Sequence, residues 1–470
     1  MLQHLLLLAV ATNGVIMAPT GFICPSSHIT ISSGVSGVVP AGATDSVPVA
    51  AGTNCTFYFD LPKGYALKVS YKGFYNPSQD DAVYFNNEFF LSPTMKNRTT
   101  GSEYDTEFAV GHTIPLAVTA ITNQMTFIVK YSFVDMSHYT QQNFTTGQYF
   151  STNIAKNTYF TIWASEGDHV AMSLSDRANS QFYDHQPENV FVYQASSCDF
   201  DFYVGRLDQI YRNFLYSDGQ ALTFVNLYED ETSNSIVLGN DWSKVKDFDE
   251  YHAIWVDPTK PETLYLGPPS SMYHNAAYTI ICDNCDHFYV ANMDFEAERT
   301  SSNGYISVQG MTPTDNQPTL ITYQYTQWTN ESLPQLIPAR MATFYASNAH
   351  SKFVVTADQG WTTSYYGRNG FLAAPKSWDP MNEQKFDYTF KDGKGGRYNY
   401  RLSIDSVILG SGDKLTMTIG NGNGTPVFTK TLTSIDSKGL NYGATGEYLT
   451  VSYQGSKGND LKMRFYDFMP

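Results

Sequence analysis

The amino-acid sequence predicts an all-β protein made of tandem antiparallel β-sandwiches, with at most one or two short helices in its middle unit. Segments that alternate apolar and polar residues recur along the chain, as in Tyr65–Val69 and Tyr448–Tyr453, and this period of two is typical of strands. Turn-forming pairs such as Asn303-Gly304 and Asn369-Gly370 separate such segments. Many short strands with frequent turns favour sandwiches over a parallel sheet.

Helical periodicity is prominent in one segment, residues 205–214. Leu207, Ile210, Tyr211 and Phe214 would share one face of a helix there. We therefore expect a short helix at this position, inside the middle unit.

Composition indicates a globular protein and excludes one class of partner. The chain has 470 residues, of which 42% are hydrophobic and 15% aromatic, enough for several packed cores. Its 29 Lys and Arg residues face 45 Asp and Glu residues, which gives a net charge of −16. Because an acidic protein repels phosphate backbones, we expect no nucleic-acid partner.

An internal repeat indicates several domains. The segments 57–64, 160–167 and 353–360 each begin with Phe, continue into a polar turn and end on Gly seven residues later. A period above 100 residues is typical of tandem domains, although generic hairpin resemblance is an alternative explanation. We expect units at 20–136, at 144–330, where the unit is longer and carries an insertion, and at 338–470.

The N-terminal segment and the sequons predict secretion. Residues 1–18 have an apolar stretch, Leu5–Ala11, that is too short to cross a bilayer and fits a signal peptide; an apolar N-terminal strand is the alternative. No later stretch is long and apolar enough for a membrane span. The sequence contains N-glycosylation sequons at Asn54, Asn97, Asn143, Asn330 and Asn423.

The cysteines predict disulfides in an oxidising compartment. They are Cys24, Cys55, Cys198, Cys282 and Cys285. We expect a Cys24–Cys55 bond, and a bond from Cys198 to either Cys282 or Cys285, which leaves one thiol over. A zinc site at Cys282–His287 would need a second pair of ligands at similar spacing, and none follows. We therefore expect no metal and no cofactor.

The sequence lacks the motifs of several common enzyme classes. The sequence has no G-x-S-x-G, no H-E-x-x-H and no Walker loop, so we expect a protein that is not an enzyme. Aromatic residues offer a binding alternative. The loop with Trp361, Tyr365 and Tyr366 follows a turn glycine and could stack on a sugar, whereas core packing is the common role of a tryptophan.

The segment Asn54–Val69, together with Cys24 and Cys55, resembles the nematode CUB-like domain over about residues 20–136. The C-terminal unit is more faintly similar to the general CUB pattern. The resemblance implies jelly-roll sandwiches that bind ligands without catalysis, in secreted, gut-associated proteins that respond to infection or stress. Calcium-binding CUB domains carry a carboxylate where this chain has Gly455, so calcium-mediated binding is not expected in that unit.

The sequence as a whole favours a secreted glycoprotein that acts as a binding module in the extracellular space or gut lumen, with a link to innate immunity. Its ligand would be a protein or a carbohydrate that the sequence does not identify. The alternative is an extracellular structural protein that self-associates into oligomers or filaments. Low charge and Tyr-rich strands, which leave sheet edges able to pair, favour that alternative.

Overall fold

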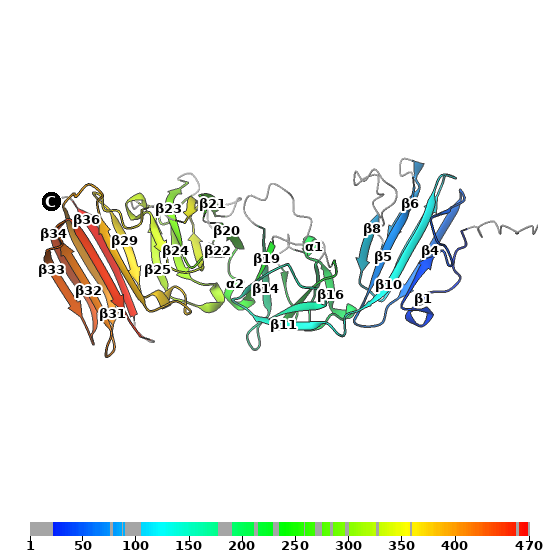
Figure 1. Cartoon of the computed structure of the whole chain (residues 1–470), viewed down its shortest axis with the longest axis horizontal. Coiled ribbons are helices and arrows are strands. Elements are labelled where there is room, and N and C mark those ends of the chain that lie inside the picture. Colours follow the sequence, from blue (N-terminus) through cyan, green and yellow to red (C-terminus); the bar gives the residue numbers. More distant parts are fainter. Residues whose placement is uncertain are drawn as a thin grey trace, which may run out of the picture. The chain divides into compact units, whose positions relative to one another are not determined.

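The computed structural model describes residues 22–468 except 76–78, 87, 90–104, 177–189, 211–214, 229–234, 258, 268–274, 283–284, 297–299, 326–328, 358–359 and 457–459. The strands in these residues form eight sheets, which face one another in pairs as four β-sandwiches (Figure 1). Regular helix within the same residues is limited to α1 (Leu207–Ile210) and α2 (Trp242–Val245), both in the middle of the chain. The predicted all-β fold with at most two short helices is therefore confirmed.

Short 3-10 helices connect some of the strands. They span Ile31–Ser33, Phe200–Phe202, Pro313–Asp315, Thr329–Ser332 and Pro375–Ser377. The chain divides into two compact units, which are described separately below. The first comprises the chain up to Tyr139 together with Ser197–Tyr203, and the second comprises the remainder.

The first sandwich belongs to the first unit. Its strands are β1 (Ile29–Thr30), β2 (Ser36–Val39), β3 (Val47–Pro48), β4 (Thr53–Asp60), β5 (Tyr65–Phe74), β6 (Ala82–Phe85), β7 (Glu88–Phe89), β8 (Asp105–Ala109), β9 (Thr113–Ala120) and β10 (Thr126–Asp135). One sheet has the order β1-β4-β9-β6-β7 and the other has the order β2-β10-β5-β8, with β3 also paired to β10. Strict alternation in β9 turns Ile114, Leu116 and Val118 toward the facing sheet, where all three are buried.

The second and third sandwiches repeat this arrangement. The second contains β11 (Thr140–Thr145), β12 (Tyr149–Ser151), β13 (Thr158–Trp163), β14 (Val170–Asp176), β15 (Val190–Tyr193), β16 (Tyr203–Arg206), β17 (Leu215–Tyr216), β18 (Ala221–Asn226) and β19 (Ser235–Asp241). The third contains β20 (Glu250–Val256), β21 (Glu262–Leu266), β22 (Asn275–Cys282), β23 (Phe288–Phe295), β24 (Tyr305–Gly310), β25 (Thr319–Gln324), β26 (Gln335–Ile337), β27 (Met341–Ser347) and β28 (Ser351–Thr356).

The fourth sandwich has eight strands. They are β29 (Asn369–Ala373), β30 (Lys385–Lys391), β31 (Tyr398–Ile408), β32 (Lys414–Gly420), β33 (Pro426–Leu432), β34 (Asp436–Gly446), β35 (Tyr448–Gln454) and β36 (Asp460–Phe468). Counted in chain order within this sandwich, the strands of the sheet β29-β36-β31-β34 are the first, eighth, third and sixth. The strands of the facing sheet, β30-β35-β32-β33, are the second, seventh, fourth and fifth. This is the strand order of a jelly roll.

The same order underlies the other three sandwiches, with one addition. Each begins with an extra strand that runs parallel to the strand it pairs with: β1 beside β4, β11 beside β13, and β20 beside β22. In the fourth sandwich, the pairing at this place is a single parallel bridge between Thr363 and Lys391 of β30. The leading strand of the first three sandwiches is therefore reduced to one bridge in the fourth.

The sheets divide the chain differently from the units expected at 144–330 and 338–470. The stretch 140–356 holds two jelly rolls, and the expected boundary near 338 falls between β26 and β27 of the third sandwich. The sequence repeat explains the difference. Phe57 and Phe160 lie on equivalent strands, β4 and β13, but Phe353 lies on β28, the last strand of its jelly roll. A similar strand-turn pattern therefore occurs at two different places in the fold.

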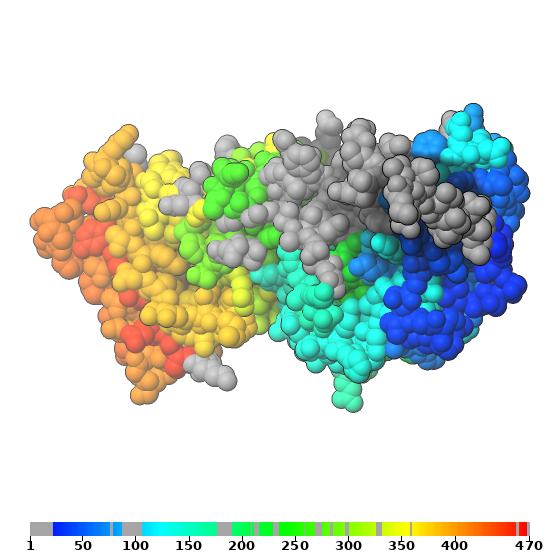
Figure 2. Space-filling view, turned by 45° about the vertical axis from the view of Figure 1, so that its right-hand side comes forward, coloured from blue at the N-terminus to red at the C-terminus, as the bar shows by residue number. Residues whose placement is uncertain are grey.

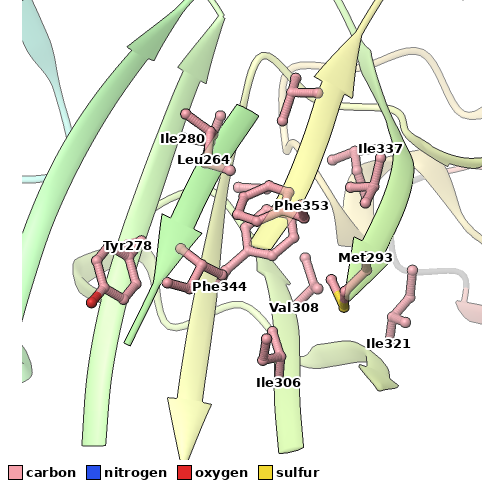
Figure 3. Packing of buried hydrophobic residues seen from close by; sticks show 14 of the residues in the cluster. Leu264, Tyr278, Ile280, Met293, Ile306, Val308, Ile321, Ile337, Phe344 and Phe353 are labelled. Atoms are coloured by element: carbon pink, nitrogen blue, oxygen red, sulfur yellow. The ribbon is translucent and has the colours of Figure 1, made fainter. Parts of the chain in front are cut away.

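Aromatic and branched side chains from both sheets fill the core of the third sandwich (Figure 3). Phe344 of β27 and Phe353 of β28 stack with ring centroids 5.2 Å apart at its centre. Ile306 and Val308 of β24 and Met293 of β23 are also fully buried in this cluster. Phe353, the first residue of the third repeat segment, therefore lies at the centre of the core of the third sandwich.

Neighbouring sandwiches of the second unit also bury side chains against each other. The hydroxyl oxygens of Ser173 and Ser175 in β14 accept hydrogen bonds from the backbone N–H groups of Ala253 (2.8 Å) and Trp255 (2.9 Å) in β20. An apolar cluster that includes Leu238 of β19 surrounds this junction. The second and third sandwiches are therefore joined by buried apolar side chains and by hydrogen bonds from backbone N–H groups to serine hydroxyls.

The third and fourth sandwiches exchange core residues. Trp378, which precedes β30, is 1% exposed and packs in the core of the third sandwich, and Ala373 of β29 packs there too. In return, Leu336 of β26 packs in the core of the fourth sandwich. Each core therefore includes side chains from the neighbouring sandwich. Fully burying such a side chain contributes roughly 1.5–3 kcal/mol to stability, so each sandwich stabilises the other.

Arg368 lies at this junction and is fully buried. Its guanidinium donates hydrogen bonds to the backbone carbonyl oxygens of Pro334 (2.6 Å) and Glu331 (3.3 Å), and it lies over the ring of Trp361, 5.3 Å from the centroid. These carbonyls and the ring compensate for the desolvation of the charge. Asp467 is buried beside it, and its backbone N–H donates to the Arg368 carbonyl oxygen.

The buried carboxyl of Asp467 predicts an unusual pH dependence of stability. Burial raises its pKa from 3.8 to about 7, against the smaller opposing effects of the Ser364 hydroxyl and the Arg368 guanidinium. The folded protein thus binds this proton more tightly than the unfolded chain, so the contribution to the free energy of unfolding is largest near pH 4 and falls as the pH rises to 7. The free energy of unfolding that depends on this carboxyl therefore changes by about 4 kcal/mol between its protonated and its ionised form.

We expect Asp467→Asn to be more stable than the parent protein at pH 8 and to lose most of that advantage near pH 4. Denaturant unfolding followed by tryptophan fluorescence measures both values, and the exposed substitution Asp436→Asn is the control. An equal effect of Asp467→Asn at the two pH values would contradict the assignment.

Candidate functional site

A groove of about 700 Å³ opens in the first sandwich (blue to cyan in Figures 1 and 2). One wall is the N-terminal arm, residues 23–29, which leads into β1 at the edge of one sheet. The other wall is the connection between β2 and β3, residues 40–46, at the edge of the facing sheet. The groove therefore lies where the two sheets of the jelly roll separate.

Two anchors hold the N-terminal arm in place. The ring of Phe22 packs edge-on against Phe57 and Phe127, with centroid distances of 5.8 and 5.6 Å. Two residues later, Cys24 forms a disulfide with Cys55 of β4. The arm is thereby fixed to the strand whose Phe57 side chain lies at the base of the groove.

Apolar side chains form the floor of the groove, together with one tyrosine. Val39, Val47 and Phe57 contribute the apolar surface, and Tyr131 of β10 packs edge-on against Phe59 beside them. Gly37 in β2 makes room for Tyr131, because a β-carbon at position 37 would collide with the tyrosine hydroxyl. Burial raises the pKa of Tyr131, so its hydroxyl stays protonated and can donate a hydrogen bond at neutral pH.

Contacts to carboxylates fix both walls at the rim. His28 Nδ1 on the arm lies 2.9 Å from the carboxylate of Asp60, whose pKa is lowered first by a hydrogen bond from the Thr113 hydroxyl and then by His28. Lys72 Nζ lies 2.8 Å from Asp45 on the opposite wall and lowers the pKa of that carboxyl. An apolar floor with a polar rim suits a ligand that inserts an apolar side chain and hydrogen-bonds at its edges.

The loop predicted to bind a ligand, residues 361–366, does not form an aromatic platform. Trp361 is 3% exposed and packs edge-on against Phe390 and Phe465 in the core of the fourth sandwich, so its assignment as a binding residue is wrong. Tyr365 is half-buried, and its hydroxyl donates a hydrogen bond to the Leu333 carbonyl oxygen at 2.7 Å. Tyr366 alone of the three is well exposed, at 66%.

The cysteines pair differently from the expected scheme in one respect. The Cys24–Cys55 bond is present, but Cys282 is bonded to Cys285 and Cys198 is free. The expected bond from Cys198 is therefore wrong. The two intervening residues let the Cα atoms of Cys282 and Cys285 approach to 5.7 Å, an ordinary disulfide distance. Cys198 instead lies buried in the segment 197–203, which belongs to the first unit.

Three of the sequon asparagines have exposed side chains: Asn54 on β4, Asn143 on β11 and Asn423 in the turn before β33. Asn143 also accepts a hydrogen bond from the indole N–H of Trp163 at 2.8 Å. Asn330 lies in a 3-10 helix, and Asn97 lies outside the described residues, as does the predicted signal peptide at 1–18. Glycosylation of all five remains a prediction.

Two other kinds of feature are absent from the described ranges. No group of three or more His, Cys, Asp or Glu side chains is placed to hold a metal ion. Among those same residues, no helix combines the length and apolar character needed to cross a membrane.

The groove does not coincide with the aromatic loop that the sequence predicts as a binding site. Its signal in the sequence is the stretch 32–46, where Ser, Gly, Ala and Pro dominate between the two cysteines of the disulfide. Such a stretch is typical of a connection that runs over the surface. A long surface connection fixed by a disulfide is a common setting for a binding site.

Peptide mapping under non-reducing conditions should recover the Cys24–Cys55 and Cys282–Cys285 pairs with Cys198 as the free thiol. Burial raises the pKa of Cys198 to about 12, which suppresses its reactive thiolate, so alkylation at pH 8 should require unfolding. The double substitution Cys24→Ser and Cys55→Ser should lower the free energy of unfolding of the first sandwich by about 3–4 kcal/mol. Rapid alkylation of Cys198 in the native protein would contradict its burial.

Comparisons with known proteins identify the domain that contains the groove. The family model of the CUB-like domain matches residues 20–137. No curated protein matches the chain. Among solved structures, the CUB1-EGF-CUB2 domains of rat MASP-1 are similar at 10% identity, over 46% of this chain and 99% of that chain, with a TM-score of 0.16.

Two further solved structures are also similar to this chain. The CUB1-EGF-CUB2 domain of human MASP-1/3 is similar at 12% identity, over 44% of this chain and all (100%) of that chain, with a TM-score of 0.18. A triple jelly roll protein of an archaeal virus is similar at 7% identity over 90% of this chain and 83% of that chain, with a TM-score of 0.14. TM-scores this low carry no argument. The family match coincides with the first sandwich, β1 to β10, and the chain therefore contains a CUB-like domain at residues 20–137.

Proposed function

We propose that this protein is a secreted, non-catalytic binding protein whose CUB-like domain captures an extended segment of a partner protein in its groove. The observation that carries the proposal is the groove itself, about 700 Å³ with an apolar floor and a polar rim. It lies between β1 and β2, the outer strands of their sheets. Outer strands present backbone N–H and C=O groups to an extended peptide, and the floor can take an apolar side chain.

Two features support an extracellular address. Both disulfides are of the kind that persist in oxidising compartments, and the presence of a CUB-like domain is consistent with an extracellular protein. The gut-luminal role in defence or stress is an extension that rests on the resemblance to nematode CUB-like proteins alone. The absence of catalysis is likewise part of the proposal, since no arrangement described above activates a nucleophile or a water molecule.

Blocking the groove tests the binding role. Peptides selected from a displayed library against the full chain should bind the parent protein, and Ala41→Trp, which adds bulk to an exposed residue of the lining, should weaken them at least tenfold. Ala51→Trp, at an exposed turn outside the lining, should leave their affinity unchanged. Selected peptides that bind Ala41→Trp as tightly as the parent would refute this use of the groove.

Expression in eukaryotic cells with the native N-terminus tests the address. We expect the protein in the medium, with both disulfides formed and with a mass that falls on treatment with peptide N-glycosidase. Substitution of the exposed Asn423 by Gln should remove one glycan, since its turn is open to the transferase. Retention of an unglycosylated protein inside the cells would contradict secretion.

A further inference from the structure

The fourth sandwich shows how a jelly roll of this chain holds an extended segment between its sheets. The segment is residues 334–338, which include β26 of the third sandwich. Alternation along β26 turns Ile337 into the core of the third sandwich (Figure 3) and Leu336 into the core of the fourth. Leu336 and Leu372 of β29 border the space that remains in this cleft, about 10 Å³. The segment therefore fills the cleft almost completely.

A glutamine side chain fixes this segment to the edge of β29. The Gln335 side-chain oxygen accepts a hydrogen bond from the Phe371 N–H at 3.0 Å, and its side-chain nitrogen donates one to the Phe371 carbonyl oxygen, also at 3.0 Å. Both groups are available because the Ala374 N–H donates to the Leu461 carbonyl oxygen. The even-numbered residues of β29 therefore bond to β36, and Phe371 faces away from it. The amide thus pairs with both backbone groups of one residue on an outer strand.

The first sandwich has the same frame beside its groove. Gly37 of β2 pairs with Tyr131 of β10, as Gly370 of β29 pairs with Phe465 of β36. In both pairs, a β-carbon on the glycine would lie 2.4 Å from the aromatic side chain, so neither position has room for one. Both outer strands belong to four-strand orders of the same form, β2-β10-β5-β8 and β29-β36-β31-β34. The strands β2 and β10 are therefore the counterparts of β29 and β36.

Val38 is the counterpart of Phe371, since each directly follows a glycine of such a pair. The Phe133 N–H of β10 donates to the carbonyl oxygen of Val35, just before β2. Because bonded residues alternate along an antiparallel pair, the odd-numbered residues of β2 bond to β10. Val38 therefore turns its N–H and C=O groups away from β10, toward the open edge, and it lines the groove.

The apolar surface next to these backbone groups also corresponds. Val39, the next residue of β2, is the counterpart of Leu372, the next residue of β29. Leu372 borders the space beside Leu336, and Val39 lines the groove together with Phe57. The remaining space is about 10 Å³ in the fourth sandwich and about 700 Å³ in the first. The first sandwich thus has room for a segment like the one that the fourth already holds.

We propose that the groove of the CUB-like domain recognises an extended segment in which a glutamine is followed directly by leucine or an apolar residue of similar size. This inference rests on the proposed function of the groove and adds the chemistry of its ligand. The glutamine amide bonds to both backbone groups of Val38, and the apolar side chain packs against Val39 and Phe57. The amide takes the place of the backbone pairing that an added strand would make.

The ligand comes from another protein and is held by these two side chains. Gln335 and Leu336 of this chain are buried at their own junction, so a second copy does not offer them. The fourth sandwich adds contacts from Arg368 to the carbonyl oxygens of the segment. The counterpart of Arg368 in the first sandwich is Val35, which is exposed and has no side-chain donor. The glutamine therefore provides a larger share of the recognition in the first sandwich.

Calorimetric titration of the full chain with two peptides tests this recognition. One peptide copies residues 332–340, and the other differs from it by Gln335→Met, which keeps the length of the side chain but removes both hydrogen-bonding groups. The first peptide should bind, and the second should bind at least tenfold more weakly. Because only the peptide changes, this comparison does not depend on the folding of a protein variant.

Proline substitutions in β2 locate the contact. Val38→Pro removes the N–H that the amide needs and should weaken the first peptide at least fivefold, with little further effect on the Gln335→Met peptide. Ser36→Pro removes another N–H that faces away from β10, outside the groove lining, and should leave the affinity within a factor of two. Equal sensitivity of both peptides to Val38→Pro would contradict the pairing of the amide with Val38.

The library peptides separate this inference from the proposed function. Those that are weakened by Ala41→Trp should share a glutamine followed by leucine, isoleucine or methionine. Groove-binding peptides without this pair, equal affinity of the two synthetic peptides, or no binding of the 332–340 peptide would overturn the inference and leave the proposed function in place. Failure to select any peptide that is sensitive to Ala41→Trp would refute the proposed function itself, and the inference with it.

Discussion

Burial of side chains across sandwich boundaries is the constraint on which the second unit depends. Trp378 leaves the fourth sandwich to complete the core of the third, and Leu336 does the reverse. Arg368 lies buried at the same junction and donates hydrogen bonds to the carbonyl oxygens of Glu331 and Pro334. A jelly roll of roughly 100 residues is large enough to fold alone, but these exchanges make the stability of each sandwich depend on its neighbour.

This dependence explains which parts of the fold could be predicted from the sequence. Alternation within a strand is a local property, and it identified the sandwich class correctly because β9 and β31 follow it closely. The division into domains is not local. It depends on which apolar faces meet, and the similarity of Phe353 to Phe57 could not reveal that one lies on the last strand of a jelly roll and the other on the second.

The candidate sites show the same limit. The Cys24–Cys55 bond was predictable because the two cysteines bracket a short segment at the N-terminus. The burial of Trp361 was not, since it follows from Phe465, which lies more than 100 residues later in the chain.

The position of Cys198 has a consequence for how the protein would survive oxidation. A secreted chain with an odd number of cysteines is exposed to covalent cross-linking with other molecules, because its unmatched thiol reacts with their disulfides. Here that thiol is 5% exposed and its ionisation is suppressed by burial. Burial thus protects the Cys198 thiol from exchange, as a third disulfide would. Unfolding of this region would expose the reactive thiol and the apolar core together.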